Sequence, residues 1–198
     1  AVQNDCLDCV ATTFSISLCK AIKKSGYIRG ANELGIRLFA FDSIEELEKI
    51  AANAPGARVF CRILTSGEGA DWPLSRKFGC EPGMARDLLL AAASLDVEPY
   101  GVSFHVGSQQ RDVGQWDTAL ATAASIFRDL EEKGVVLKMV NMGGGFPTRY
   151  LKDVPAAEAY GAAIFEALTT HFGNRIPETI IEPGRGLVAS SMSLLTRI

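Results

Sequence analysis

The feature of this sequence that most constrains its fold is a regular alternation of short apolar runs with helix-like stretches from about residue 36 onward. The composition of a buried β-strand recurs in five runs, at residues 36–41, 57–64, 99–104, 135–142 and 179–181. Helical patterns lie between them, at about residues 43–52, 82–95, 115–133 and 156–172. Because a helix that connects two strands carries the chain back along the sheet, the strands should be parallel.

Two folds repeat such strand–helix units, namely the (β/α)8 barrel and the open doubly wound sheet. Each unit here spans roughly 40 residues, and five strands are too few to close a barrel, which takes about 250 residues. The expected fold class is therefore α/β, as a partial (β/α)8 TIM-type barrel. Residues 36–198 should form the barrel portion, whereas residues 1–35 are an N-terminal segment that fits the pattern poorly.

Local signals refine the expected elements. Ser43 and Glu46 have the spacing of a capping box, in which each side chain binds the free backbone amide of the other residue. Gly134 follows the longest helical pattern, at the position where a glycine ends a helix. Residues 66–80 contain Gly, Asp and Pro and are expected to form a loop.

Charge and cysteine content argue against several classes of protein. The net charge of -3 provides no basic surface for nucleic acid or for an anionic membrane. No apolar run approaches the roughly 18 residues of a membrane span, and no signal-peptide pattern opens the sequence, so we expect a cytoplasmic protein. Five cysteines, an odd number, do not suggest a disulfide framework. Cys6 and Cys9 form an isolated CxxC, but with only His105 and His171 as histidines no metal site is expected.

Three polar or glycine-rich motifs each end an apolar run. They are His105-Val-Gly-Ser108, Gly143-Gly-Gly145-Phe-Pro147 and Glu182-Pro-Gly-Arg185. Since the carboxyl ends of parallel strands emerge on one face of the fold, the three motifs should converge there into a single active site.

The chemistry of these motifs points to a ligand with a phosphate group. Consecutive backbone amides such as those of Gly144 and Gly145 bind phosphate, and a planar, permanently charged guanidinium such as that of Arg185 suits it. Ser108 adds a hydroxyl donor. The glycines lack the spacing of a dinucleotide site, which favours a monophosphate. A tight turn and a structural Glu–Arg pair are the alternative explanations.

Two further residues describe the rest of the ligand. The flat ring of His105 could stack on an aromatic group, and Glu182 could hold a proton on a heterocyclic nitrogen. A histidine that merely packs in the core is the alternative for His105. Together the motifs specify a phosphate, a flat heterocycle and a pyridine-type nitrogen beside a carboxylate, which are the parts of pyridoxal phosphate (PLP).

These residues resemble the fold-type III PLP-dependent decarboxylases, specifically the ornithine decarboxylase branch, over about residues 36–186. Besides the three motifs, the resemblance includes Phe39-Ala-Phe-Asp-Ser43, Phe60-Cys-Arg-Ile63 and Trp72-Pro-Leu-Ser-Arg-Lys-Phe-Gly-Cys80. Phe146-Pro147 is more similar to the ornithine and lysine enzymes than to the diaminopimelate ones.

The resemblance implies a (β/α)8 barrel with PLP at its mouth, followed in the family by a β-rich C-terminal domain that is absent from residues 1–198. It implies a lyase that decarboxylates a basic amino acid, with the conversion of L-ornithine to putrescine in polyamine biosynthesis as the expected reaction. The amino-acid substrate would bind in a homodimer whose active sites are completed across the interface.

Site residues follow from their positions in the family's motifs. His105 would stack on the pyridine ring and act in catalysis, and Glu182 would pair with the ring nitrogen. The full set of cofactor-binding residues would be Arg62, His105, Ser108, Gly144, Gly145, Glu182, Gly184 and Arg185.

Two other interpretations stay open. The family holds PLP through a lysine in an Ala-Val-Lys strand near the start of the barrel, and Ala1-Val2-Gln3 places a glutamine there. Lys20, which follows Cys19, resembles a later Cys-Lys of the family instead. The chain could therefore be a catalytically inactive relative that acts by binding a partner. A PLP-carrier protein or an alanine-racemase-like barrel is the third interpretation. Such proteins share the fold but not these motifs, and racemases place an arginine at the ring nitrogen, where this chain has Glu182.

Overall fold

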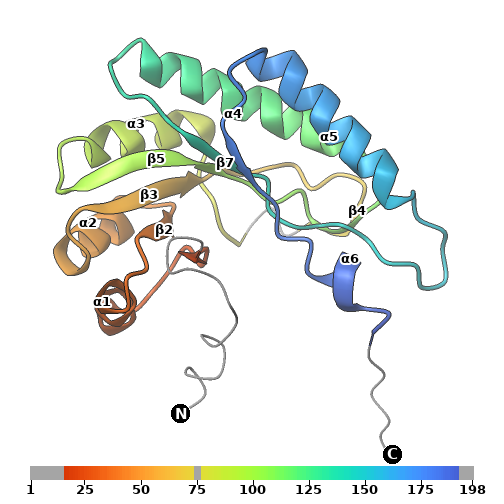
Figure 1. The fold of residues 1–198 in the computed structure, drawn as a ribbon, viewed down its shortest axis with the longest axis horizontal. Coiled ribbons are helices and arrows are strands. Elements are labelled where there is room, and N and C mark those ends of the chain that lie inside the picture. The colour runs from red at the N-terminus through yellow and green to blue at the C-terminus, as the bar shows by residue number, and fades with distance from the viewer. Residues whose placement is uncertain (1–15, 74–76, 192–198) are drawn as a thin grey trace, which may run out of the picture.

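A six-stranded parallel sheet is the main feature of the computed structural model, which describes residues 16–73 and 77–191 (Figure 1). The strands lie in the order β1-β2-β3-β5-β7-β8, and each pairs in parallel with its neighbours. They are β1 (Ser17–Leu18), β2 (Leu38–Phe41), β3 (Ala57–Arg62), β5 (Val97–Ser103), β7 (Met139–Asn141) and β8 (Glu178–Ile180). The sheet is curled, as in part of a barrel.

Helices alternate with these strands and cover one face of the sheet (Figure 1). They are α1 (Ser25–Glu33), α2 (Ile44–Asn53), α3 (Pro82–Ala92), α4 (Gln115–Glu131) and α5 (Ala157–Phe172), and a short α6 (Arg185–Val188) follows β8. The predicted α/β partial barrel is confirmed. Strand β7 is shorter than the apolar run at 135–142, and the first residue of that run belongs to the end of α4, since the amide of Val135 donates to the carbonyl of Leu130.

The N-terminal part of the described chain contributes to the same sheet. Residues 16–33 fitted the repeat poorly in the sequence, yet they form β1 and α1. Strand β1 pairs with β2 through Ser17↔Leu38 and Leu18↔Phe39. Gln3, Cys6 and Cys9, on which other interpretations of the sequence depend, lie outside the described residues.

The prediction of a loop over residues 66–80 is wrong in part. Residues Ala70–Trp72 form strand β4, which pairs antiparallel with β6 (Ser108–Gln110). We call this pair the β4–β6 ribbon. Asp71 and Trp72 are exposed, so the strand carries no apolar pattern, and its hydrogen bonds go to a segment far away in the sequence.

Only half of the predicted capping box forms. The hydroxyl of Ser43 accepts from the amide of Glu46 at 3.3 Å, as expected. The carboxylate of Glu46 instead accepts from the amide of Lys23 at 3.1 Å and lies 3.0 Å from the Lys23 ammonium. Because Lys23 is buried, its charge needs this partner, and that requirement outweighs the second capping bond.

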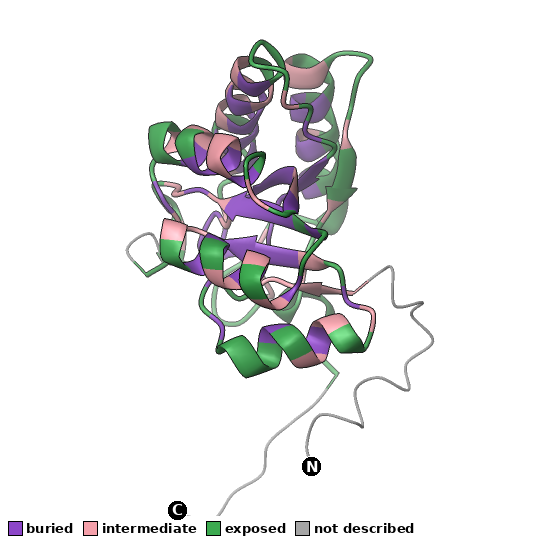
Figure 2. Ribbon diagram, turned by 90° about the vertical axis from the view of Figure 1, so that its left-hand side faces the viewer, coloured by how far each residue is buried: buried purple, intermediate pink, exposed green. Residues whose placement is uncertain are grey.

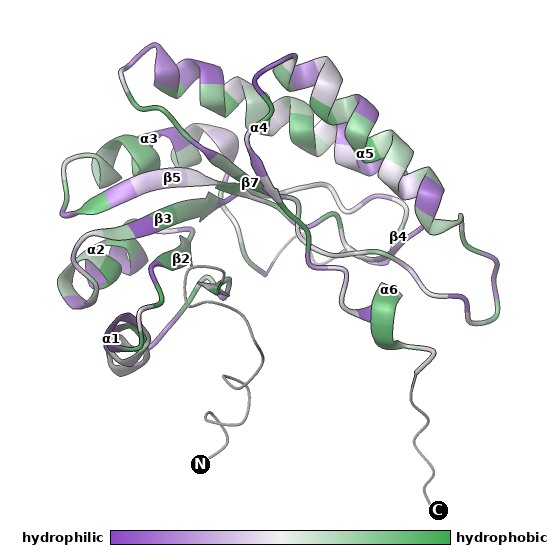
Figure 3. Ribbon diagram, viewed as in Figure 1, coloured by the Kyte–Doolittle hydropathy of each residue, from purple (hydrophilic) through white to green (hydrophobic). Residues whose placement is uncertain are grey.

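Alternate side chains on each strand pack on opposite faces of the sheet. The larger apolar core lies between the sheet and its helices and includes Phe39, Phe41, Val59 and Trp116. A smaller cluster on the other face consists of Ala40, Phe60, Tyr100 and Met139. Buried residues are accordingly concentrated on the strands and on the inner sides of the helices (Figure 2), and hydrophobic and hydrophilic residues are interspersed along the helices (Figure 3). Within residues 16–73 and 77–191, none of the helices combines the length and apolarity that a membrane span requires.

Candidate functional site

A small pocket lies where the carboxyl ends of β3, β5, β7 and β8 come together. Its lining includes Arg62, His105, Asn141, Gly143 and Glu182. These residues end or directly follow four different strands, so the parallel sheet alone accounts for their convergence. Three of them, Arg62, His105 and Glu182, were predicted from the sequence as site residues.

Asn141 organises the carboxylate side of the pocket. Its Nδ2 donates to Oε1 of Glu182 at 2.8 Å, and its Oδ1 accepts from the amide of Gly143 at 2.9 Å. The Asn141 side chain is almost fully buried, so both bonds are made away from bulk water. The sequence analysis missed this residue. Its signal was a polar side chain inside an apolar run, two residues before the glycines.

The glycine motif is packed against the other two motifs. A Cβ atom at Gly144 would lie 2.6 Å from the carbonyl oxygen of Glu182 and 3.2 Å from Nε2 of His105. A Cβ atom at Gly145, where φ is +103°, would lie 2.4 Å from the carbonyl oxygen of Gly107. Only glycine fits such close backbone approaches, so this segment brings the histidine and glutamate motifs into contact.

His105 is held in its neutral form. Its Nδ1 accepts from the amide of Gly107 at 3.0 Å, which leaves the proton of the neutral ring on Nε2. Burial lowers the pKa of His105, and the charge of Arg62 lowers it further, while Glu182 partly opposes both effects. The pocket therefore presents an uncharged, flat imidazole at neutral pH.

Two other groups set the electrostatics of the pocket. Burial lowers the pKa of the Arg62 guanidinium, which still remains a cation at neutral pH and lies 5.6 Å from the ring centre of Phe78. Burial and the nearby Glu182 raise the pKa of the Cys19 thiol to about 11. Cys19 is thus a protonated, unreactive thiol at the edge of the pocket.

The remaining predicted residues lie beside the pocket. Ser108 begins β6 and pairs with Trp72 across the β4–β6 ribbon. The carbonyl of Gly145 accepts from the amide of Gln110 at 2.9 Å, which places the glycine motif against the same ribbon. Gly184 caps the N-terminus of α6 with φ at 41°, and Arg185 is the first residue of that helix. The structure therefore brings the predicted residues into one neighbourhood around the strand ends.

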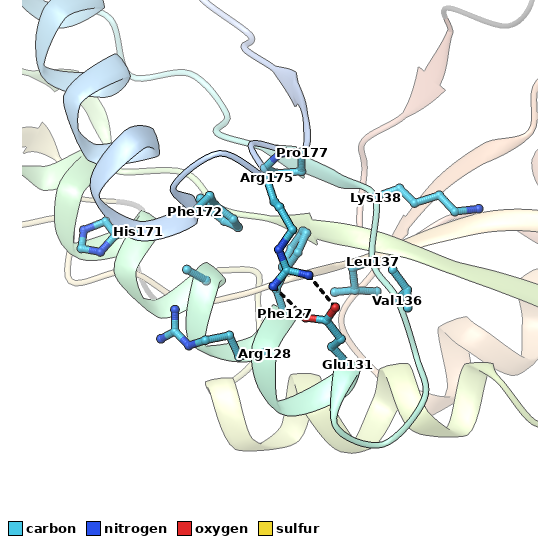
Figure 4. A pocket seen from close by; sticks show the side chains of 11 residues that line it. Phe127, Arg128, Glu131, Val136, Leu137, Lys138, His171, Phe172, Arg175 and Pro177 are labelled. Carbon is cyan, nitrogen blue, oxygen red and sulfur yellow. Dashed lines mark hydrogen bonds and ion pairs between the residues drawn. The ribbon is translucent and has the colours of Figure 1, made fainter.

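A larger cavity, of about 230 Å³, lies at the opposite end of the sheet, against the segments that lead into β7 and β8 (Figure 4). The aromatic rings of Phe127 and Phe172 line it. Glu131 and Arg175 form an exposed, two-point ion pair across it, with distances of 2.7 and 3.2 Å. None of the residues that the sequence motifs singled out for the site lines this cavity.

A family model matches most of the chain. The model of the pyridoxal-binding domain of pyridoxal-dependent decarboxylases matches residues 5–189 of the chain. This match spans all three motifs.

Several curated proteins are similar to the chain over most of its length. The lysine/ornithine decarboxylase of Selenomonas ruminantium is 33% identical over 179 residues, which are 89% of this chain and 45% of that protein. The ornithine decarboxylase of Caenorhabditis elegans is 34% identical over 89% of this chain and 42% of its own length. Antizyme inhibitor 2 of Xenopus laevis is 35% identical over 91% of this chain and 39% of its own length. The chain thus spans less than half the length of these relatives.

Solved structures share the fold. A crystal structure titled as an SrLDC mutant in complex with PLP superposes with a TM-score of 0.82 at 31% identity, over 89% of this chain and 46% of that one. The arginine decarboxylase of Paramecium bursaria Chlorella virus superposes with a TM-score of 0.77 at 27% identity, over 86% of this chain and 46% of its own.

Proposed function

Because the chain belongs to the pyridoxal-dependent decarboxylases, we propose that the protein decarboxylates a basic amino acid, with L-ornithine as substrate and putrescine as product. The similarity to ornithine and lysine/ornithine decarboxylases supports this choice of substrate class. The family's cofactor is PLP, and residues 5–189 of the chain match its pyridoxal-binding domain.

The observation that carries this proposal is the position of the Glu182 carboxylate, which lies beside the glycine motif (Gly143–Gly145) and the neutral imidazole of His105. Asn141 holds one oxygen of Glu182 at 2.8 Å. The glycine motif comes so close to Glu182 and His105 that even a Cβ atom at Gly144 would clash. A flat, phosphorylated pyridine needs a carboxylate at its nitrogen, an uncharged surface for its ring and backbone amides for its phosphate. The residues present supply all three.

We assign each residue a role in this site. Glu182 would hold a proton at the pyridine nitrogen, and Asn141 would keep the carboxylate in place. His105 would lie against the ring, and Arg62 would stand near it. Ser108, the amides of Gly144 and Gly145, and the N-terminus of α6 at Gly184 and Arg185 would hold the phosphate. When bound, PLP supplies an electron-withdrawing ring that stabilises the negative charge left after CO2 departs.

An assay of CO2 release tests the proposed reaction. The protein, supplied with PLP, would be given carboxyl-labelled L-ornithine, L-lysine, L-arginine or diaminopimelate. We expect release from L-ornithine to exceed release from the others. If CO2 release is fastest from lysine or arginine, that amino acid replaces L-ornithine as the proposed substrate. No release from any of the four would overturn the proposed activity.

A non-catalytic relative that acts by binding a partner protein is the second candidate. The 35% identity to an antizyme inhibitor favours it. The pocket lining contains no lysine from the described part of the chain, and Lys23 is buried in an ion pair with Glu46. Borohydride reduction after incubation with PLP, followed by peptide mapping, separates the two candidates. One dominant modified lysine supports the enzyme, and scattered or absent labelling supports the second candidate.

We also propose a cytoplasmic homodimer, since the ornithine decarboxylase branch is expected to complete its active sites across a dimer interface. Sedimentation velocity of the protein with PLP checks the oligomeric state, and a monomer at all concentrations would contradict the dimer.

A further inference from the structure

Trp72 is an exposed tryptophan to which the proposed function gives no task. It lies at the end of β4 with 54% of its surface exposed to solvent. A single exposed apolar side chain is common on a protein surface, so what matters at Trp72 is the group that lies against it. The position of Trp72 is well defined, since it pairs with Ser108 across the β4–β6 ribbon.

Arg185 lies against this tryptophan. The centre of its guanidinium is 5.8 Å from the centre of the Trp72 ring, within the range of a cation–π interaction. Its Nη1 donates to the hydroxyl of Tyr150 at 3.0 Å. Two side chains from different segments therefore restrain one guanidinium, which keeps further N–H donors for an anion.

The segments that carry these side chains are themselves joined into a closed ring of contacts. Strand β6 is linked to the segment before Tyr150 by Gln109, whose side chain donates to the Thr148 carbonyl at 2.9 Å and accepts from the Thr148 amide at 2.8 Å. Gln109 has a φ of 56°, which is unusual for a residue other than glycine. The two hydrogen bonds to Thr148 are therefore made by a residue in a strained backbone conformation. This circuit of contacts starts with the strand pairing of Trp72 and Ser108 and continues through Gln109 to Thr148. It then passes along the chain to Tyr150, whose hydroxyl binds Arg185, and the guanidinium of Arg185 closes the circuit at Trp72.

This circuit of contacts lies next to the residues proposed to hold the phosphate. Ser108 is a member of it, and the carbonyl of Gly145 is bonded to β6 through the amide of Gln110. Helix α6 also lies against the glycine motif, since a Cβ atom at Gly186 would be 3.0 Å from Cβ of Phe146. A change in the position of Arg185 would therefore change its distance from Ser108 and Gly145.

We propose that Trp72 is a positioning residue for the cofactor phosphate: by its cation–π contact it holds the Arg185 guanidinium beside Ser108. The inference rests on the proposed function, because it takes Arg185 as a phosphate ligand. It adds a residue outside the three motifs and a reason for the β4–β6 ribbon.

The test compares a phosphorylated with an unphosphorylated ligand. Pyridoxamine 5′-phosphate and pyridoxamine differ only in the phosphate, and neither carries the aldehyde that would react with surface lysines. Their Kd values would be measured by isothermal titration calorimetry for the wild-type protein, Trp72→Ala, Trp72→Phe, Arg185→Ala and the Trp72→Ala/Arg185→Ala double variant. Phe165→Ala, which removes an exposed aromatic ring on α5, is the matched control.

We expect Trp72→Ala to raise the Kd for pyridoxamine 5′-phosphate about threefold to fivefold, as the loss of one exposed cation–π contact should do. The Kd for pyridoxamine should not change, and Trp72→Phe should restore part of the lost affinity. Arg185→Ala should have a larger effect, and the double variant should bind no more weakly than Arg185→Ala alone. The Phe165→Ala control should match the wild type.

Three outcomes would overturn the inference while leaving the proposed function intact. They are an unchanged Kd for the phosphorylated ligand in Trp72→Ala, an equal loss for both ligands, and additive effects in the double variant. Phosphate-specific weakening in a protein that releases no CO2 from any substrate would instead support the role of Trp72 and overturn the enzymatic proposal. A wild-type protein that does not bind pyridoxamine 5′-phosphate at all would overturn both.

Discussion

The two ends of the parallel sheet differ in what their pockets contain. The cavity at the amino ends of β7 and β8 is the larger one, yet its charged feature is an exposed pair between Glu131 and Arg175 (Figure 4). The pocket at the carboxyl ends is small, and it contains a buried asparagine that holds the carboxylate of Glu182. Size and chemistry therefore point to opposite ends of the molecule.

The pKa shifts at the two ends have different causes. At the carboxyl end, burial is the leading cause of the shifts of Cys19, Arg62 and His105. At the amino end, the pKa of Glu131 is lowered by its direct bond to Arg175, and both groups face water. Shifts caused by burial among several charged groups are typical of functional sites, whereas an exposed pair is screened by solvent. The smaller pocket at the carboxyl ends of the strands is therefore the better candidate for the functional site.

The largest effect should come from the carboxylate at the ring nitrogen. Glu182→Gln keeps the shape of the side chain but removes the charge that would hold a proton there, so we expect kcat for decarboxylation to fall by about 100-fold or more. The matched control is Glu178→Gln at the amino end of β8, the strand that leads to Glu182; Glu178 accepts from the hydroxyl of Tyr100 at 2.8 Å. Steady-state kinetics give kcat for both variants. Similar losses of kcat in the two would show that the carboxyl end of the sheet is no more important for catalysis than the amino end.

Next in size should be the effect of adding a side chain to the glycine motif. Gly144→Ala places a methyl group 2.6 Å from the carbonyl oxygen of Glu182, and the surrounding backbone must shift to accept it. We expect a loss of about 1–3 kcal/mol in the free energy of unfolding, measured by urea denaturation, and weaker binding of PLP. Gly161→Ala on α5 is the control, since nothing lies within 4 Å of its Cβ position. Equal stability of the two variants would show that the backbone around Gly144 can accept a methyl group without strain.

A smaller effect should appear in the pH dependence of stability. The pKa of His105 is lower in the folded protein than its ordinary value, mainly because of burial. Below the ordinary histidine pKa of about 6.5 the unfolded chain takes up the proton first, so this residue makes stability fall as pH decreases from about 6.5 toward the folded pKa.

Comparison of the wild type with His105→Gln isolates that contribution. The variant should lose less stability than the wild type between pH 7 and pH 5 in urea titrations at each pH. A steeper loss in the variant would mean that His105 is charged in the folded protein.

The smallest effect should come from the exposed ion pair at the amino end. Glu131→Gln removes the partner of Arg175, but the pair is exposed and screened by solvent, so the thermal unfolding midpoint and the decarboxylation kinetics should both match the wild type. Differential scanning calorimetry and the CO2 assay check this. A clear loss of activity in this variant would reverse the ranking of the two pockets.

Local sequence patterns predicted the alternation of strands and helices and the three strand-end motifs that meet at the candidate site. Apolar runs and helical periodicity report burial directly, so the strand ends with His105, the glycine motif and Glu182 could be located without coordinates. The details that escaped prediction depend on partners far away in the sequence. Asn141 was hidden in an apolar run, and the β4–β6 ribbon has no periodic pattern of its own. The second bond of the capping box was lost to Lys23 for the same reason.

The contacts around Gly144 and Gly145 have a consequence for how such a site can evolve. A Cβ atom at Gly144 would lie 2.6 Å from the carbonyl oxygen of Glu182, and one at Gly145 would lie 2.4 Å from that of Gly107, so packing alone restricts both positions to glycine, whatever their amides bind. Natural selection would therefore keep these positions as glycine even in a descendant that had abandoned catalysis, as long as the three strand ends stayed together. A glycine motif of this kind is therefore weak evidence of catalysis, and the test of an active site lies in the proposed role of the Glu182 carboxylate and in the mapping of a lysine that binds PLP.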